Sequence, residues 1–180
     1  MKHLLALIAC LLLGLTSCGE SENMYCNIYA RFVVDMVPSV IPLNTALNSM
    51  GEFCTIKVEN NGYHFYGSKT DQLVPKTALA EYSGFYLGLS GFIVGLPSIP
   101  EMGYDVPRVI CYDLACPNCY QEYNFTKQMK MLNGTTCQCP SCQRTYDLND
   151  QGIVSKGEAG RSLFRYRISY VGNVMVIANK

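Results

Sequence analysis

Two short cysteine motifs are the strongest candidates for a functional site in this chain, because of their residue types and their spacing. They span Cys116–Cys119 and Cys139–Cys142, both read C-P-x-C, and nineteen residues separate the inner cysteines. A C-x-x-C turn directs its two sulfurs to one side, so two such turns brought together form a cage of four thiolates. Such a cage suits Zn²⁺, a single iron or an iron–sulfur cluster. The spacing therefore predicts a metal centre on Cys116, Cys119, Cys139 and Cys142.

The identity of the metal decides what such a centre could do. A zinc ion needs only four thiolates at about 2.3 Å in a tetrahedron, and it would stabilise the fold without doing chemistry. An iron–sulfur cluster would make the protein an electron carrier. Without a metal, either motif could act as a redox-active dithiol. Thioredoxin-like enzymes, however, carry one such motif at the start of a helix in a βαβ unit.

Enzymatic activity has little support in the sequence. The only histidine after the N-terminal segment is His64, which lies in a predicted strand far from both motifs. Asp113 and Asp147 flank the motifs, where turn or strand-end roles account for them, and no G-x-S-x-G nucleophile motif occurs. A site with four cysteine ligands also leaves no open coordination position for substrate. We therefore expect an electron carrier or a binding protein rather than an enzyme.

The N-terminus carries an export signal. A basic start precedes the apolar run Leu4–Leu15, which is too short to cross a bilayer. The following Leu-Thr-Ser-Cys resembles the bacterial lipobox, whose cysteine receives lipid; an ordinary secretory signal is the alternative. The resemblance implies that residues 1–17 are cleaved, that Cys18 is lipidated and that 18–26 form a tether. It places the protein in the bacterial cell envelope, and Gly19, where aspartate would retain the protein in the inner membrane, favours the outer membrane.

Export affects the interpretation of the eight cysteines that follow the lipobox. Thiols outside the cytoplasm tend to oxidise, so disulfide bonds are an alternative for all of them. Cys26, Cys54 and Cys111 lie in strand-like runs, and we expect them to be buried, unreactive thiols. Cys137 lies two residues before Cys139, and its role stays open between a spare thiol, a disulfide partner and an alternative ligand.

Composition and turn signals predict one all-β domain over residues 27–180. The net charge is zero and no basic stripe suits nucleic acid, while thirteen tyrosines, seven phenylalanines and fifteen glycines suit strands and turns. One helical turn is expected within Leu43–Met50. Strands are expected at Ile28–Val37, Glu52–Glu59, Tyr63–Ser68, Phe85–Val94, Arg108–Leu114, Arg144–Leu148, Phe164–Tyr170 and Val174–Ala178.

The C-terminal part of the chain contains a characteristic order of motifs. The second cysteine motif is followed by Tyr146–Leu148, Gly152–Val154, Gly157, Leu163, Tyr166 and Val174–Val176. This order resembles the second half of a Rieske iron–sulfur domain, and the expected strand before Cys116 looks like the strand that leads to the first ligands in that family. The resemblance implies an antiparallel β sandwich or barrel with a small inserted metal-binding lobe at about 112–148.

The proposed ligand residues differ from those of the Rieske family. A Rieske [2Fe–2S] centre uses two cysteines and two histidines, with potentials from about −150 to +300 mV. Here Cys116 and Cys139 match the family's cysteines, Cys142 stands in place of the second histidine, and Cys119 replaces the first with a shift of one residue. Tyr146 matches a residue that hydrogen-bonds a ligand sulfur in that family. An all-cysteine cluster would have a low potential, because thiolates add negative charge and plant-type ferredoxins lie near about −400 mV.

Together these features predict a membrane-tethered, Rieske-like electron-transfer protein with an all-cysteine [2Fe–2S] cluster and a redox partner that the sequence does not identify. The resemblance favours the cluster over zinc. The first alternative is a structural four-cysteine zinc lobe on a non-catalytic binding lipoprotein. The second is a redox-active dithiol protein.

Overall fold

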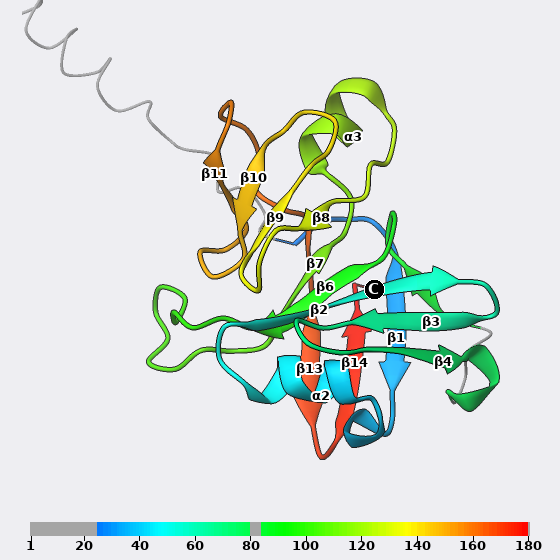
Figure 1. The fold of residues 1–180 in the computed structure, drawn as a ribbon. Coiled ribbons are helices and arrows are strands. Elements are labelled where there is room, and N and C mark those ends of the chain that lie inside the picture. The colour runs from blue at the N-terminus through cyan, green and yellow to red at the C-terminus, as the bar shows by residue number, and fades with distance from the viewer. Residues whose placement is uncertain (1–24, 80–83, 180) are drawn as a thin grey trace, which may run out of the picture.

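The computed structural model describes residues 25–79 and 84–179, which form three antiparallel sheets and two α-helices. The dominance of antiparallel strands confirms the prediction of an all-β fold. Within these residues, no helix has the length and apolar character needed to cross a bilayer. The predicted signal peptide and Cys18 lie outside the described residues. Figure 1 shows two parts, a larger β body and a smaller lobe at one end.

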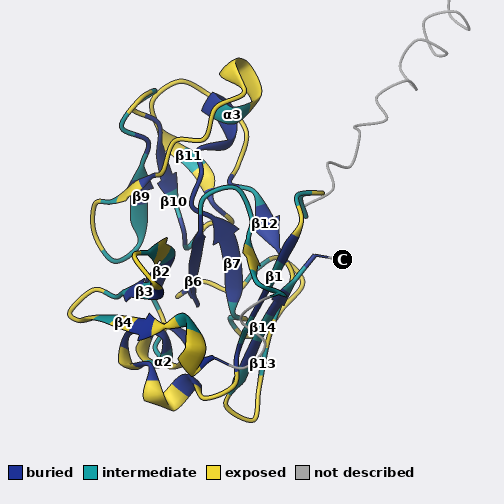
Figure 2. Cartoon of the chain, turned by 90° about the vertical axis from the view of Figure 1, so that its right-hand side faces the viewer, coloured by how far each residue is buried: buried dark blue, intermediate teal, exposed yellow. Residues whose placement is uncertain are grey.

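A six-stranded sheet forms the centre of the molecule. Its spatial order is β12 (Arg165–Tyr166), β7 (Ile110–Asp113), β6 (Phe92–Leu96), β2 (Glu52–Glu59), β3 (Gly62–Tyr66) and β4 (Asp71–Pro75). Successive residues of its central strands point to opposite faces, and both faces are covered. Phe53 and Ile93 enter a core on the lobe side, whereas Cys54 and Phe92 enter a core on the other side. Figure 2 shows β6 and β7 as almost wholly buried.

The second sheet and the first helix cover one face of the six-stranded sheet. The sheet has the order β13 (Ile168–Val171), β14 (Val174–Ala178), β1 (Ala30–Val34) and β5 (Tyr86–Leu87). The 3-10 turn η1 (Val37–Ser39) directly precedes helix α2 (Ile41–Asn48), and a second 3-10 turn, η2 (Lys76–Ala78), follows β4. Proline within the first turn suits the start of α2, because no intrahelical N–H is needed there. Together these elements enclose the first core, in which Phe32 makes edge contacts with Tyr63 and Phe85.

The lobe covers the opposite face, and we define it as residues 114–164, between β7 and β12. It contains helix α3 (Pro117–Tyr123) and a sheet of the order β11 (Ile153–Lys156), β10 (Thr145–Asp147), β9 (Thr136–Gln138) and β8 (Lys130–Met131). Its second core packs Leu114, Tyr146 and Leu148 against Phe53 and Ile93 of the six-stranded sheet. The lobe therefore lies on the body and shares a continuous apolar contact with it.

Two predicted strands were wrong, because each is divided between two sheets, and several elements were missed. The segment Phe164–Tyr170 contributes to β12 and β13, which belong to different sheets. The segment Phe85–Val94 forms two strands, β5 and β6, which belong to different sheets. Between them the chain turns at Gly88, whose φ of 62° lies in the left-handed region that glycine tolerates. The carboxylate of Asp113 holds this turn by accepting the Leu89 N–H at 2.7 Å. Strands β4, β8, β9 and β11 and helix α3 were not anticipated.

Candidate metal centre

The first cysteine motif forms the start of helix α3. Cys116 precedes the helix, Pro117 occupies its first turn, and Cys119 follows within that turn. Residues three apart lie on one face of a helix, so this arrangement turns both sulfurs the same way. The N–H of Cys116 donates to the Lys127 carbonyl at 2.9 Å, and the Cys116 carbonyl accepts the Tyr120 N–H at 3.1 Å. Both backbone groups of Cys116 are thus paired.

The second motif forms the turn between β9 and β10. The N–H of Cys139 donates to the Arg144 carbonyl, and the N–H of Gln143 donates to the Cys139 carbonyl, both at 3.0 Å. Gln143 has a φ of 61°, so the chain reverses through a left-handed residue directly after Cys142. The turn brings the two sulfurs of this motif toward those of the first.

The four predicted ligand sulfurs converge. The Sγ atoms of Cys116, Cys119, Cys139 and Cys142 all lie within 4.8 Å of one another. Two close pairs join different motifs: the Sγ atoms of Cys116 and Cys142 are 3.7 Å apart, and those of Cys119 and Cys139 are 3.6 Å apart. Cys142 is partly exposed and the other three are buried. This group could bind a metal, either as a zinc ion or as an iron–sulfur cluster.

Tyr146 on β10 supports one of these sulfurs. Its hydroxyl lies 3.2 Å from the Cys116 Sγ and accepts a hydrogen bond from the Asn118 Nδ2 at 2.9 Å. Because the amide supplies the proton there, the hydroxyl proton is free to point at the sulfur. Asn118 is itself fixed by Arg161, whose N–H donates to its Oδ1 at 3.0 Å and whose carbonyl accepts from its Nδ2 at 3.1 Å. No local sequence pattern indicates the role of Asn118, since its partners lie 28 and 43 residues away.

Burial opposes the ionisation that a metal site requires. It raises the pKa of the Cys116 and Cys119 thiols, and the neighbouring sulfurs add to this effect. Burial also acts on Cys142, but hydrogen bonds from the backbone and side chain of Arg144 outweigh it and lower the pKa of that thiol to about 7. Arg144 is held in turn by Glu158, with 2.7 Å between Nη2 and Oε2. A bound cation would compensate for the repulsion among the gathered thiolates.

The remaining cysteines of the described residues are free thiols outside this group. Cys54 and Cys111 are buried in the first core, as expected, and Cys26 is partly buried beside it. Cys137 is buried in the second core, where its thiol donates to the Met129 Sδ at 3.7 Å. Burial raises the pKa of Cys137 to about 12. In this structure Cys137 is a spare core thiol.

The other polar residues singled out by the sequence have structural roles. His64 lies on β3, with its Nδ1 3.0 Å from a Glu59 oxygen and its Nε2 2.8 Å from an Asp71 oxygen. Asp113 is fully buried and accepts hydrogen bonds from the Tyr166 hydroxyl and from two backbone N–H groups. Asp147 accepts the Asn149 N–H at 2.9 Å and so closes a turn. None of the three belongs to the four-sulfur group.

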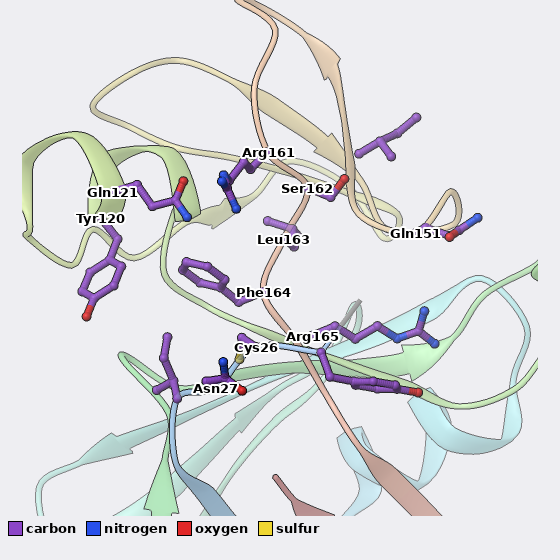
Figure 3. Close-up of a pocket in the computed structure, with 13 residues that line it drawn as sticks. Cys26, Asn27, Tyr120, Gln121, Gln151, Arg161, Ser162, Leu163, Phe164 and Arg165 are labelled. Atoms are coloured by element: carbon purple, nitrogen blue, oxygen red, sulfur yellow. The ribbon is translucent and has the colours of Figure 1, made fainter. Parts of the chain in front are cut away.

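A cavity of about 620 Å³ lies beside the lobe, and Figure 3 shows the side chains around it. Tyr120 and Gln121 of α3 form one wall, and the segments 25–28 and 161–165 contribute much of the rest. Arg161, whose backbone holds Asn118, also borders this space. The cavity therefore adjoins the support of the metal centre without containing its sulfurs.

Comparison of the chain with protein-family models, with curated proteins and with solved structures finds no match in any of the three. Support for a function therefore comes from the geometry of the four sulfurs and from the residues that hold them. The four cysteines, three of them buried, form a site that could bind a metal.

Proposed function

We propose that this protein is a lipid-anchored protein of the bacterial envelope that binds one zinc ion, and that the ion holds its lobe together. The observation that carries the proposal is the short span of the four sulfurs. In a tetrahedron with metal–sulfur distances of about 2.3 Å, neighbouring sulfurs lie about 3.8 Å apart. The pairs at 3.7 and 3.6 Å agree with this spacing, and no pair exceeds 4.8 Å.

A [2Fe–2S] cluster fits this span less well. Its four thiolates are divided between two irons, and the bridging sulfides separate the two pairs. Sulfurs on different irons therefore lie further apart than sulfurs on one iron, whereas here all four are close neighbours. The three antiparallel sheets and the added lobe support a Rieske-like scaffold. The ligand set on that scaffold suits a single ion.

A structural role follows from the closed site and from the small size of the lobe. Four cysteine ligands complete a tetrahedral zinc ion, which leaves no position for substrate. The four strands of the lobe are only two to four residues long, so backbone pairing alone holds them weakly. A metal that joins α3 to the β9–β10 turn adds the constraint that the short strands lack.

A mononuclear iron in the same site is the second candidate function. Partial exposure of Cys142 places one edge of the centre near solvent, where electrons could enter or leave. The Tyr146 hydroxyl beside the Cys116 sulfur would favour the more negatively charged form of such a centre, because it donates to a thiolate. This candidate keeps electron transfer without the two-iron cluster.

Elemental analysis and a visible spectrum of the full mature protein distinguish these possibilities. One zinc per chain in a colourless protein supports the proposal, and one iron without acid-labile sulfide supports the second candidate. Two irons with two sulfides per chain would replace both with the [2Fe–2S] electron carrier. A metal-free protein whose thiols cycle would support the dithiol alternative. The anchor is tested separately, by the mass of the N-terminal peptide that begins at Cys18.

Two alanine variants provide a matched test of the ligands. Cys139→Ala should lose the bound metal, because it removes one of four ligands from a closed site. Cys137→Ala should keep one metal per chain, since Cys137 is an equally buried thiol of the same lobe that lies outside the group. Metal content after gel filtration measures both. Retention of the metal by Cys139→Ala, or its loss from Cys137→Ala alone, would contradict the assigned ligand set.

A further inference from the structure

The loop between β6 and β7, residues 97–109, exposes an unusual number of apolar side chains. Met102 at its tip is 94% exposed, and Ile99, Tyr104 and Val106 are also exposed. Single exposed apolar side chains are common on protein surfaces, but four within eight residues form a patch that calls for a partner. Figure 1 shows this loop in green, projecting from the side of the body.

Two neighbouring segments extend this patch. A Cβ built at Gly51 would lie 3.8 Å from the Ser98 Cβ, and one built at Gly134 would lie 3.7 Å from the Gly51 carbonyl oxygen, so the three segments meet. Met50 and Leu132 lie on these segments, and both are exposed. We call the resulting set the apolar face: Met50, Ile99, Met102, Tyr104, Val106 and Leu132.

The loop is anchored to the body at several points. The Glu101 carboxylate forms a two-pronged ion pair with Arg165, in which Nη2 and Oε2 are 2.9 Å apart. The Ser98 N–H donates to the Asn149 Oδ1 at 2.9 Å. The Arg108 guanidinium lies over the Tyr104 ring, 4.2 Å from its centre. These contacts hold the loop in place, so the outward position of its apolar side chains belongs to the fold.

The same ion pair links the loop to the start of the described chain. Tyr25 forms a backbone bridge with Arg165, and the Arg165 guanidinium lies 5.7 Å from the centre of the Tyr25 ring. Glu101, next to the tip of the loop, and the point where the N-terminal tether joins the body therefore meet at Arg165. Tyr25 lies seven residues after Cys18, and a fully extended chain of that length reaches at most about 25 Å. A lipid on Cys18 would hold this side of the body close to a bilayer.

We propose that the apolar face inserts into the phospholipid bilayer that holds the anchor, and so fixes the orientation of the domain. This inference rests on the lipid anchor of the proposed function. Transfer of methionine, valine and isoleucine side chains from water into the bilayer is favourable, and tyrosine and arginine suit the headgroup region. The charge of Glu101 is paired with Arg165, and the loop also contains one negative residue, Asp105, and one positive residue, Arg108. We therefore expect the hydrophobic effect, and not electrostatic attraction, to drive binding to lipid.

The chain contains no tryptophan, so one introduced indole reports on its own surroundings. The variant Met102→Trp places it at the tip of the loop, where the wild-type side chain touches little. The matched control is Val171→Trp, which is 77% exposed beside the β13–β14 turn and lies outside the apolar face. The lipidated proteins are incorporated into vesicles of phosphatidylethanolamine and phosphatidylglycerol, with and without brominated acyl chains.

The expected result is a blue-shifted emission of Met102→Trp that brominated lipid quenches, with neither effect for Val171→Trp. The shift should persist in 0.5 M salt, roughly where the Debye length falls below 5 Å, because apolar contacts are not screened. Water-like emission from both variants, on protein whose Cys18 carries lipid, overturns the inference while leaving the anchor intact. A blue shift of Met102→Trp without vesicles that grows with protein concentration also overturns it, because a second copy then covers the face.

The mass of the N-terminal peptide shows independently whether Cys18 carries lipid. If it carries none, the anchor in the proposed function is wrong. The unanchored Met102→Trp protein, titrated with the same vesicles, then tests the face by itself. A blue shift under these conditions supports insertion, and its absence overturns it. In that titration, Val106→Gln added to Met102→Trp should weaken partition about tenfold, because one large apolar contact is lost.

Discussion

At the scale of single residues, the hydroxyl of Tyr146 is the support of the metal centre that a substitution can remove most cleanly. Tyr146→Phe deletes the group 3.2 Å from the Cys116 Sγ, while Asn118 keeps its hydrogen bonds to Arg161. Loss of a partner to a metal ligand typically lowers metal affinity about 10-fold to 100-fold. We expect a decrease of this size, measured by competition with a chromophoric chelator, and a retained fold.

The control for this prediction is Tyr112→Phe. Tyr112 is equally buried in the second core, and its hydroxyl donates to the Leu148 carbonyl at 3.4 Å rather than to a sulfur. Tyr112→Phe should lose about 1 kcal/mol of stability, because it gives up one buried hydrogen bond. Tyr146→Phe should lose about 2 kcal/mol, because its hydroxyl contacts both the Cys116 Sγ and the Asn118 Nδ2. Equal metal affinities in the two variants would show that Tyr146 only fills space.

His64 predicts a pH dependence of stability that is separate from the metal centre. Burial alone would lower the pKa of His64, but its hydrogen bonds to Asp71 and Glu59 outweigh this and raise it. Both partners are substantially exposed, and Lys57 also lies nearby, over the Tyr66 ring at 5.2 Å. A raised pKa means that the folded state binds the proton more tightly. The resulting stability is fully present below the unfolded pKa of about 6.5 and is lost as pH rises through the folded value.

The measurement is the free energy of unfolding in urea between about pH 6 and 9, for the wild type and for His64→Gln. The wild type should lose more stability over this range than the variant, by up to about 1 kcal/mol, as for other partly exposed ion pairs. The metal centre titrates in both proteins, so the difference between the two curves isolates the histidine. Parallel curves would contradict this assignment.

At the scale of elements, the turn that separates β5 from β6 should tolerate no side chain at Gly88. The added methyl group of Gly88→Ala would overlap the Tyr166 hydroxyl and the Asp113 carboxylate, at a φ of 62°. Overpacking and left-handed strain together cost about 3 kcal/mol. Gly172→Ala is the matched control, with a φ of 58° and no neighbour within 4 Å, and it should cost only about 1 kcal/mol. Urea unfolding compares the two, and equal costs would contradict the proposed overlap.

Local sequence signals predicted elements well where local residues determine them. The expected strands Glu52–Glu59 and Tyr63–Ser68 correspond to β2 and β3, which pair directly as a hairpin. The Phe85–Val94 segment failed because an apolar run does not reveal a turn whose stabilising carboxylate, Asp113, lies 24 residues beyond Leu89. Helix α3 was missed because the first cysteine motif was interpreted as a short turn, although proline in a first helical turn is common.

The candidate site, like the helices and strands, was predictable where neighbouring residues determine it. The C-P-x-C repeat predicted four converging sulfurs, because each motif fixes the direction of its own pair. The support from Asn118 depends on Tyr146 and Arg161, which only the folded chain brings together. The number of metal atoms likewise depends on how closely the two motifs approach, and motif spacing in the sequence does not determine that distance.

At the scale of the whole molecule, the six-stranded sheet separates two cores of different composition. The first core contains long strands, helix α2 and a cluster of aromatic rings around Phe32. The second core consists largely of one sheet face and the lobe, and it includes three of the four proposed ligands, with Cys142 packed at its edge. The body therefore has its own apolar stabilisation, whereas a large part of the lobe's interior is the metal centre.

This division predicts how the protein responds to loss of the metal. Treatment with a strong chelator should speed amide hydrogen exchange in α3 and in β8–β11, because their short strands lose the constraint that joins the two motifs. Exchange in β2 and β3, which pack on the first core, should change little, since that core contains none of the proposed ligands. Cys139→Ala should show the same pattern without chelator, and Cys137→Ala should not. Uniform loss of protection across both cores would mean that the metal holds the whole fold, and unchanged protection in the lobe would exclude a structural metal.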